Sequence, residues 1–153
     1  MIENRSAPGA MIVNLCYGDV EKAIAWLCDT FGFVERYRYG PADQVVGAQL
    51  SLGGAIVMLF GPRIGHGAAD SFEFRAPRPN EGSHSVGIRV EDVHAHHARA
   101  VECGARVLLP PETYQFGERQ YSAEDFAGHL WTFSQSVADV APADWGARVG
   151  GIT

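Results

Sequence analysis

Three histidines stand close together in the stretch EDVHAHHARA, at His94, His96 and His97. Imidazoles at such spacing could hold zinc, iron or nickel if they converged on one point. In a helix that opens at Asp92, His94 and His97 share a face, while His96 points elsewhere. The packed side of this helix is assigned to Val93, Ala98 and Val101. The preferred interpretation is therefore exposed histidines on a surface helix, with a metal-binding His94/His97 pair as the alternative.

The helix that carries these histidines belongs to a repeat within the chain. The segment GDVEKAIAWLCDTFGFV (18–34) parallels EDVHAHHARAVECGARV (91–107), so that Asp19 matches Asp92. Downstream, GGAIVMLFG resembles AGHLWTFSQ, and Gly54 matches Gly128 at nearly the same offset. Two separate segments that repeat at one spacing indicate an internal duplication.

Each half has the same predicted order of a strand, a helix and three more strands. The first half is predicted to have a strand over 11–17, a helix over 19–31 and strands over 33–39, 45–52 and 55–60. The second half is predicted to have a strand over 84–90, a helix over 92–103 and strands over 105–109, 119–124 and 129–135. The fold class is thus α+β, with two tandem βαβββ modules. One domain is expected over 1–153, divided into module one (about 10–61), a linker (62–83), module two (about 84–136) and a tail (137–153).

Composition and charge narrow the possible partners. Hydrophobic residues make up 46% of the 153 positions and charged residues 20%, which is typical of a globular domain. The net charge is −6 and no Lys/Arg cluster interrupts it, so nucleic acid is not an expected partner, whereas a neutral or cationic small molecule is. The sequence has neither a long apolar run nor a signal peptide, so we expect a cytoplasmic protein that does not bind membranes.

Three runs carry a resemblance to a known family: DVEKAIAWLCDTFGF, SHSVGIRVEDVHAHHARAVECGA and FGERQYSAEDFAGHLWTF. They resemble the vicinal oxygen chelate superfamily, which includes glyoxalase I, extradiol dioxygenases and bleomycin-resistance proteins. The resemblance covers about residues 10–136. It implies a curved mixed sheet with the helices on its convex face and the ligand site on its concave face. It also implies a homodimer.

The resemblance further implies where metal ligands would stand. Metal-dependent members place a His or Glu on the first and fourth strands of each module. The corresponding positions here are Ile12, Met58, Ser85 and Thr132. None of these is a plausible primary ligand for a divalent ion, so we expect a member without a metal cofactor that binds a small organic molecule. A one-residue slip would bring in His84, which keeps a divalent metal as an alternative.

Strand alternation separates a core face from a candidate ligand face. The apolar set comprises Val13, Leu15, Leu50, Leu52, Val57, Leu59, Val86, Ile88, Val90, Trp131 and Phe133. The opposite, mixed set comprises Asn14, Gln49, Ser51, Met58, Phe60, Ser85, Arg89 and Thr132. Carrying the repeat offset into the strand over 119–124 adds Arg119 and Tyr121. These residues are the predicted ligand-binding set, although such a face could instead be simply solvated.

Two further groups complete the candidates. The aromatic residues proposed to contact an apolar ligand are Phe60, Phe72, Phe74, Tyr114 and Phe116. No catalytic residue is assigned. The alternative function is a lyase, isomerase or dioxygenase of the same superfamily, which would use either a metal or the acid–base groups His84, Glu118 and Tyr121.

Overall fold

A computed structural model describes residues 9, 11–64, 73–148 and 150. Module one contains β1 (Val13–Cys16), α1 (Val20–Phe31), β2 (Val34–Tyr39), β3 (Gly47–Leu52) and β4 (Ala55–Phe60). Module two contains β7 (Ser85–Arg89), α2 (Val93–Glu102), β8 (Arg106–Thr113), β9 (Glu118–Glu124) and β10 (Leu130–Ser136). Between the modules, the two short strands β5 (Arg63–Ile64) and β6 (Glu73–Phe74) pair antiparallel, and η1 (Pro142–Trp145) is a 3-10 turn after module two.

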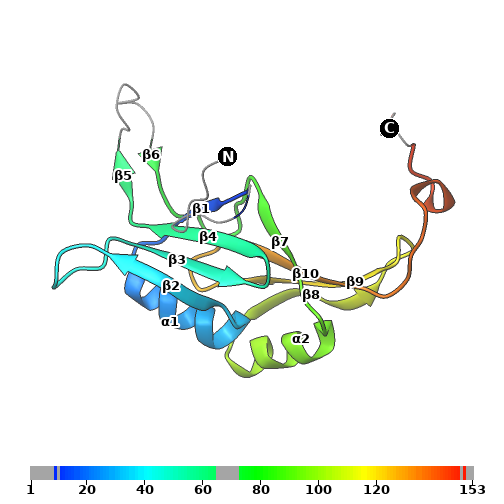
Figure 1. The fold of residues 1–153 in the computed structure, drawn as a ribbon, viewed down its shortest axis with the longest axis horizontal. Helices are drawn as coiled ribbons and strands as arrows, with labels where there is room; N and C mark the ends of the chain where they lie inside the picture. Colours follow the sequence, from blue (N-terminus) through cyan, green and yellow to red (C-terminus); the bar gives the residue numbers. More distant parts are fainter. Residues whose placement is uncertain (1–8, 10, 65–72, 149, 151–153) are drawn as a thin grey trace.

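Each module folds into one four-stranded mixed sheet. The strand orders are β1-β4-β3-β2 and β7-β10-β9-β8, and in both the first strand pairs in parallel with the last. The other neighbours are antiparallel. Figure 1 shows the sheets side by side in one curved layer, with both helices beneath it. The predicted α+β class with two tandem βαβββ modules is confirmed.

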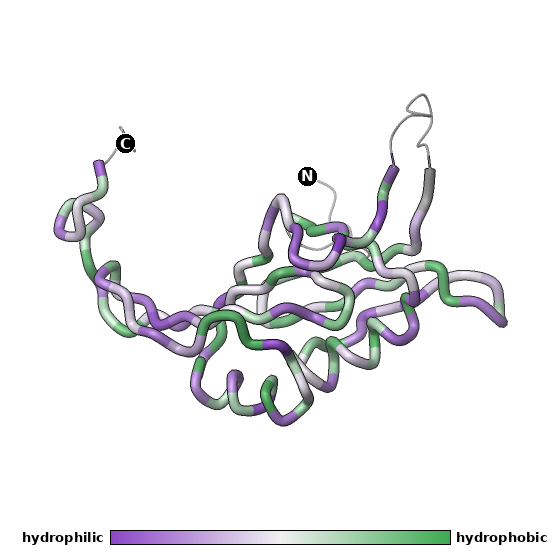
Figure 2. Tube along the Cα trace, turned by 180° about the vertical axis from the view of Figure 1, so that it is seen from behind, coloured by the Kyte–Doolittle hydropathy of each residue, from purple (hydrophilic) through white to green (hydrophobic). Residues whose placement is uncertain are grey.

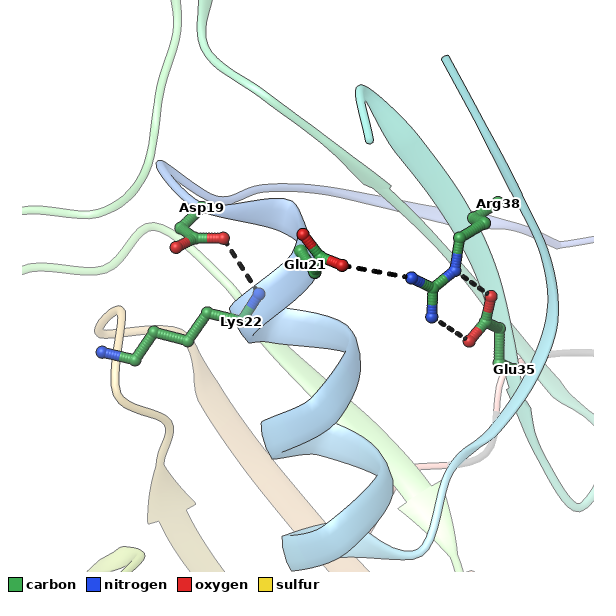
Figure 3. Close-up of polar contacts among 5 residues, drawn as sticks. All are labelled: Asp19, Glu21, Lys22, Glu35 and Arg38. Carbon is green, nitrogen blue, oxygen red and sulfur yellow. Dashed lines mark hydrogen bonds and ion pairs between the residues drawn. The ribbon is translucent and has the colours of Figure 1, made fainter. Parts of the chain in front are cut away.

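Aspartate caps start both helices, as the repeat predicts. The Asp19 carboxylate accepts a 2.9 Å hydrogen bond from the backbone nitrogen of Lys22, as drawn in Figure 3. Asp92 accepts the equivalent bond from the nitrogen of Ala95 at 3.0 Å. The first helix ends at Gly32, whose φ of 77° is the left-handed conformation that glycine adopts at low cost.

A charged clamp holds the start of α1 against β2. The guanidinium of Arg38 forms a bidentate pair with Glu35, at 2.6 and 2.7 Å, and also lies 3.5 Å from the Glu21 carboxylate (Figure 3). Hydrogen bonding from Arg38 holds the pKa of Glu35 below its usual value, so the pair stays ionised. Because these groups are largely exposed, the clamp contributes orientation more than stability.

The core lies between the sheets and the helices, where strand alternation predicted it. Of the predicted set, these side chains are buried: Leu15, Leu50, Val57, Leu59, Val86, Ile88, Trp131 and Phe133. Val13, Leu52 and Val90 are partly buried and pack against them. Figure 2, seen from behind, shows apolar positions alternating with polar ones along the sheets. None of the helices in the described ranges is long and apolar enough to cross a membrane.

The predicted packed face of the histidine helix is wrong in part. Val93 is buried, but Ala98 is exposed and Val101 is 51% exposed. The packed stripe instead follows the 3.6-residue period through the buried Val93 and Ala100, with the partly buried His96 between them. His96 points into the junction between the two helices, where one ring nitrogen lies 2.8 Å from the carbonyl oxygen of Phe31.

The C-terminal segment packs on the far end of module two. The ring of Trp145 meets the edge of Phe116 at 5.8 Å, and Phe116 stacks on Tyr114 at 5.3 Å. The side-chain amide of Gln115 donates to the carbonyl oxygen of Trp145 at 3.4 Å. Tyr114 and Phe116 therefore serve here as a platform for the tail.

Candidate functional site

The open face of module one brings several predicted residues onto neighbouring strands. Asn14 on β1 and Gln49 on β3 both lie beside Met58 on β4, as Cα partners across the sheet. The amide of Gln49 lies 3.2 Å from the Met58 sulfur and donates to the Tyr37 hydroxyl at 3.0 Å. Phe60 stands two residues along β4 on this face, and Ser51 two residues along β3. The predicted module-one set thus lies on one face of the sheet, where the Gln49 side chain is nevertheless buried.

The open face of module two is more polar. The Thr132 hydroxyl lies 3.0 Å from that of Ser122, while Ser85 is exposed at the start of β7. Arg89 donates to the Glu118 carboxylate at 2.7 Å, and Gln120 donates to its other oxygen at 2.8 Å. Ser85, Arg89 and Thr132 therefore lie on the predicted face, next to the acid–base candidate Glu118 and to Gln120 and Ser122, which were not among the predicted residues.

The prediction that Arg119 and Tyr121 join this face is wrong. Tyr121 is the Cα partner of Phe133 and is 1% exposed within the core, on the helix side of the sheet. Its hydroxyl lies 2.6 Å from a ring nitrogen of His96. Arg119 is the partner of Gln135, whose side chain accepts from the backbone nitrogen of Val93 at the start of α2. Both residues therefore belong to the face of the sheet that the helices cover.

A pocket of about 410 Å³ opens where β1, the linker and the start of β7 and β10 meet. Its apolar wall comes from Phe74, Ala76, Pro77 and Leu130. Its polar groups are Asn14, Cys16, Arg75, Arg78, Glu81, Ser83, His84 and His129. This mixture and this volume fall in the range of small-molecule sites. Of the predicted ligand-binding set, the pocket includes Asn14.

Contacts across the module junction fix the floor of this pocket. A ring nitrogen of the buried His129 lies 2.7 Å from the carbonyl oxygen of Cys16, so β1 is joined to the turn before β10. The Cys16 thiol lies 3.7 Å from the carbonyl oxygen of Phe74, and the Phe74 ring meets the edge of Phe60 at 6.4 Å. The pocket therefore depends on the docking of the modules and the linker.

The sequence of this chain matches a known protein family. The family model for the Glyoxalase/Bleomycin resistance protein/Dioxygenase superfamily matches residues 11–133. The chain belongs to this superfamily. The uncharacterized protein Rv0887c of Mycobacterium tuberculosis strain ATCC 25618 / H37Rv is 30% identical over 134 residues, which are 86% of this chain and 76% of that protein. The uncharacterized protein Mb0911c of Mycobacterium bovis is also 30% identical, over 86% of both chains.

Several solved structures share this architecture. TioX from Micromonospora sp. ML1 is 29% identical with a TM-score of 0.66, and the match covers 84% of this chain and 98% of TioX. A glyoxalase/bleomycin resistance protein/dioxygenase from Nocardioides gives a TM-score of 0.67 at 17% identity, over 96% of this chain and 93% of that one. The fosfomycin resistance protein FosX from Listeria monocytogenes gives a TM-score of 0.59 at 15% identity, over 84% of this chain and 93% of FosX. The last two likenesses concern the fold alone.

The metal positions of the superfamily carry unsuitable donors in this member. The Met58 thioether lies against the Gln49 amide, and the Thr132 hydroxyl bonds to Ser122. Ile12 has no donor atom, and Ser85 offers only an exposed hydroxyl. Within the described part of the chain, no three His, Cys, Asp or Glu side chains are grouped so as to hold an ion. The residues at these four positions do not fit the metal, and independence from metal stays a prediction.

The candidate acid–base groups differ in what they can do. Hydrogen bonds from Gln120 and Arg89 hold the pKa of Glu118 below its usual value, so it is a poor proton acceptor. Burial raises the pKa of Tyr121 well above that of an ordinary phenol, and this hydroxyl faces His96. His84 alone among the three lines the pocket.

Sequence reasoning missed the linker wall of the pocket. Of the aromatic candidates in the linker, Phe74 lines the pocket and Phe72 lies outside the described residues. The segment from Arg75 to Ser83 has no strand or helix periodicity, so alternation could not place it. Its Pro and Asn-Glu-Gly turn chemistry was the available signal for a folded wall.

Proposed function

We propose that this superfamily member binds a small organic molecule in the pocket between β1, the linker and the start of β10, without a metal cofactor. The observation that carries the proposal is the pocket itself. It combines the apolar surfaces of Phe74, Pro77 and Leu130 with polar groups such as Asn14 and His84. A site of this composition holds an apolar ring by contact and orients it by a few hydrogen bonds.

A homodimer and a cytoplasmic location are part of the same proposal. Membership of the superfamily supports the dimer, since its members commonly build ligand sites from paired modules. The open face is also left without a covering layer by the described residues, because both helices lie beneath the sheets (Figure 1). A second copy of the chain placed over this face would shield a bound ligand from water.

The alternative function, an acid–base lyase, isomerase or dioxygenase, rests on one group. Tyr121 lies on the helix side of the sheet and Glu118 is held as an ion by Arg89 and Gln120. His84, with its ring nitrogen 3.2 Å from the Ser83 hydroxyl, remains at the pocket. Turnover of a bound compound that is abolished in His84→Gln would favour this alternative.

The direct test is a thermal-shift screen of untagged protein against a panel of aromatic and heteroaromatic compounds. A compound at 100 times its Kd should raise the free energy of unfolding by about 2.7 kcal/mol. Ala76→Trp fills the pocket from the linker side and should abolish the shift. The matched control is Ala98→Trp, on the exposed side of α2. Equal shifts in both variants, or a panel without any stabilising compound, would contradict the proposal.

A further inference from the structure

A second chamber of about 490 Å³ adjoins the pocket of the proposed function. Both chambers are lined by Glu81, Gly82, His84, Gly128 and Leu130. Beyond this shared wall, the second chamber, which is open to solvent, is lined by Asn80, Ser85, Arg106, Leu108 and Glu124. Because five residues border both spaces, the two chambers meet along one wall, at which His84 stands.

The linker turn over the second chamber is held by specific bonds. Arg106 on β8 donates to the Glu124 carboxylate at 2.6 Å and to the side chain of Asn80 at 3.4 Å. The backbone nitrogen of Glu81 donates to the carbonyl oxygen of Arg78 at 3.1 Å, which closes the turn. Asn80 takes a φ of 59°, a left-handed conformation that asparagine tolerates better than most residues. The wall is therefore folded onto module two.

Gly128 keeps the space beside Glu124 open. Its φ is +96°, and a Cβ there would lie 3.5 Å from Oε1 of Glu124 and 3.7 Å from the Cβ of Pro77. A side chain at this position would extend into the gap between the carboxylate and the linker. Because Arg106 bonds the other oxygen, Oε2, the Oε1 atom faces this opening.

The two chambers differ in charge. The first has two guanidinium groups, Arg75 and Arg78, beside one carboxylate, Glu81. Among its described lining residues, the second has two carboxylates, Glu81 and Glu124, and one guanidinium, Arg106, which pairs with Oε2 of Glu124, so acidic groups outnumber basic ones there. Its apolar surface comes from Leu108 and Leu130. The second chamber therefore suits an alkyl chain that ends in a cation, whereas the first suits a neutral or acidic ring system.

We propose that the two chambers form one groove for an elongated ligand, with a ring system in the first chamber and an amine-bearing chain in the second. The chain passes His84 and places its ammonium group between Glu81 and Glu124. This inference rests on the proposed function, because it takes the first chamber as the ring site. It names the ligand class as an alkylamine that carries an aromatic ring, with the ammonium group several bonds away from the ring.

Three fluorescent probes test the groove: dansylamide, N-pentyl-dansylamide and dansylcadaverine. The first has only the ring system, the second adds a neutral chain, and the third adds the same chain with a terminal ammonium group. Dansylcadaverine should bind about fivefold more tightly than the pentyl compound, as expected for one partly exposed ion pair. This advantage should shrink in high salt, because exposed charges are screened.

Three variants test whether the affinity gained from the chain and its ammonium group comes from the second chamber. Glu81→Gln removes a carboxylate while its backbone hydrogen bond in the turn is kept, and it should reduce the dansylcadaverine advantage. Leu108→Trp fills the second chamber and should remove the benefit of both chains while dansylamide still binds. Glu102→Gln, at the exposed end of α2, is the charge-matched control and should change nothing.

The two proposals fail differently in this experiment. If dansylamide binds and neither chain adds affinity, or if the pentyl and cadaverine compounds bind equally, the second chamber is not a ligand site for a cation and the inference is overturned. If none of the probes binds to the wild-type protein, the ring site itself is contradicted for this class, and the inference falls with it.

Discussion

The hydroxyl of Tyr17 in module one donates a 2.6 Å hydrogen bond to Oδ2 of Asp125 in module two. The same oxygen accepts from the indole nitrogen of Trp131 at 3.0 Å, while Oδ1 accepts from the backbone nitrogens of Ala127 and His129 at 2.9 and 3.0 Å. Burial and the adjacent Asp125 raise the pKa of Tyr17, so the phenol stays protonated and remains the donor. One buried carboxylate thus joins β1 to the turn that borders the pocket.

Removing the Tyr17 hydroxyl should therefore loosen the module junction. Tyr17→Phe deletes one of four hydrogen bonds to a buried carboxylate, and we expect a loss of about 1.5–3 kcal/mol in the free energy of unfolding. Urea denaturation followed by tryptophan fluorescence measures it. Tyr114→Phe, on the hairpin far from the junction, is the control and should cost much less. An equal loss in the two variants would refute the role given to Asp125.

Protonation of His96 should make stability depend on pH. Burial in the helix junction lowers its pKa below the usual 6.5. Its Nε2–H donates to the carbonyl oxygen of Phe31, so Nδ1 is the acceptor of the Tyr121 hydroxyl, an arrangement that requires the neutral ring. Between the folded and unfolded pKa values, the unfolded chain binds more protons. The contribution of His96 to the free energy of unfolding is therefore fully present above about pH 6.5. It decreases as the pH drops toward the folded pKa.

The contribution of His96 can be isolated by variants. His96→Gln should flatten the pH dependence between about pH 5 and pH 7, whereas His94→Gln, on the exposed side of the same helix, should preserve it. The measurement is urea denaturation at several pH values in constant ionic strength. A wild-type slope in His96→Gln would show that His96 does not cause the effect.

Sequence alternation predicted the strands and the core well because burial follows the period of the strand. It failed on β9, where Arg119 and Tyr121 were assigned to the open face. A shift of one residue exchanges the two faces of a strand, and the repeat offset differs by one between the two matched segments. The local pattern held the answer, since Gln120, Ser122 and Glu124 are polar and alternate with the apolar Tyr121 and Ala123.

The pocket was less accessible to sequence reasoning than the sheets. Its walls come from β1, from an aperiodic linker and from a turn more than a hundred residues after β1, so no local pattern joins them. His96 was misjudged for a similar reason. Its burial depends on the end of α1, and the helical period alone could not show that Phe31 lies opposite. Tertiary contacts decide both cases.

The end of α1 should depend on a side chain from the other module. Arg99 on α2 donates to the carbonyl oxygen of Asp29 in the last turn of α1 at 2.8 Å, and to that of Cys28 at 3.0 Å, which also accepts from the backbone nitrogen of Gly32. Arg99→Met retains most of the aliphatic contact and removes both bonds. We expect a loss of about 1 kcal/mol in the free energy of unfolding. Arg148→Met, at an exposed position of the C-terminal segment, is the control, and a loss of equal size there would argue against a specific cap.

Chelation separates the metal-free proposal from its alternative. Ile12, Met58, Ser85 and Thr132 offer no adequate ligand set, so prolonged dialysis against EDTA should leave the melting temperature and probe binding unchanged. Native mass spectrometry should give a dimer at its apo mass. The protein is used without a histidine tag, because the tag would bind metal itself. A dimer that carries one or two divalent ions, lost on chelation with a fall in melting temperature, would contradict this assignment. His84→Ala and a paired His94→Ala/His97→Ala variant would then show which imidazoles hold the ion.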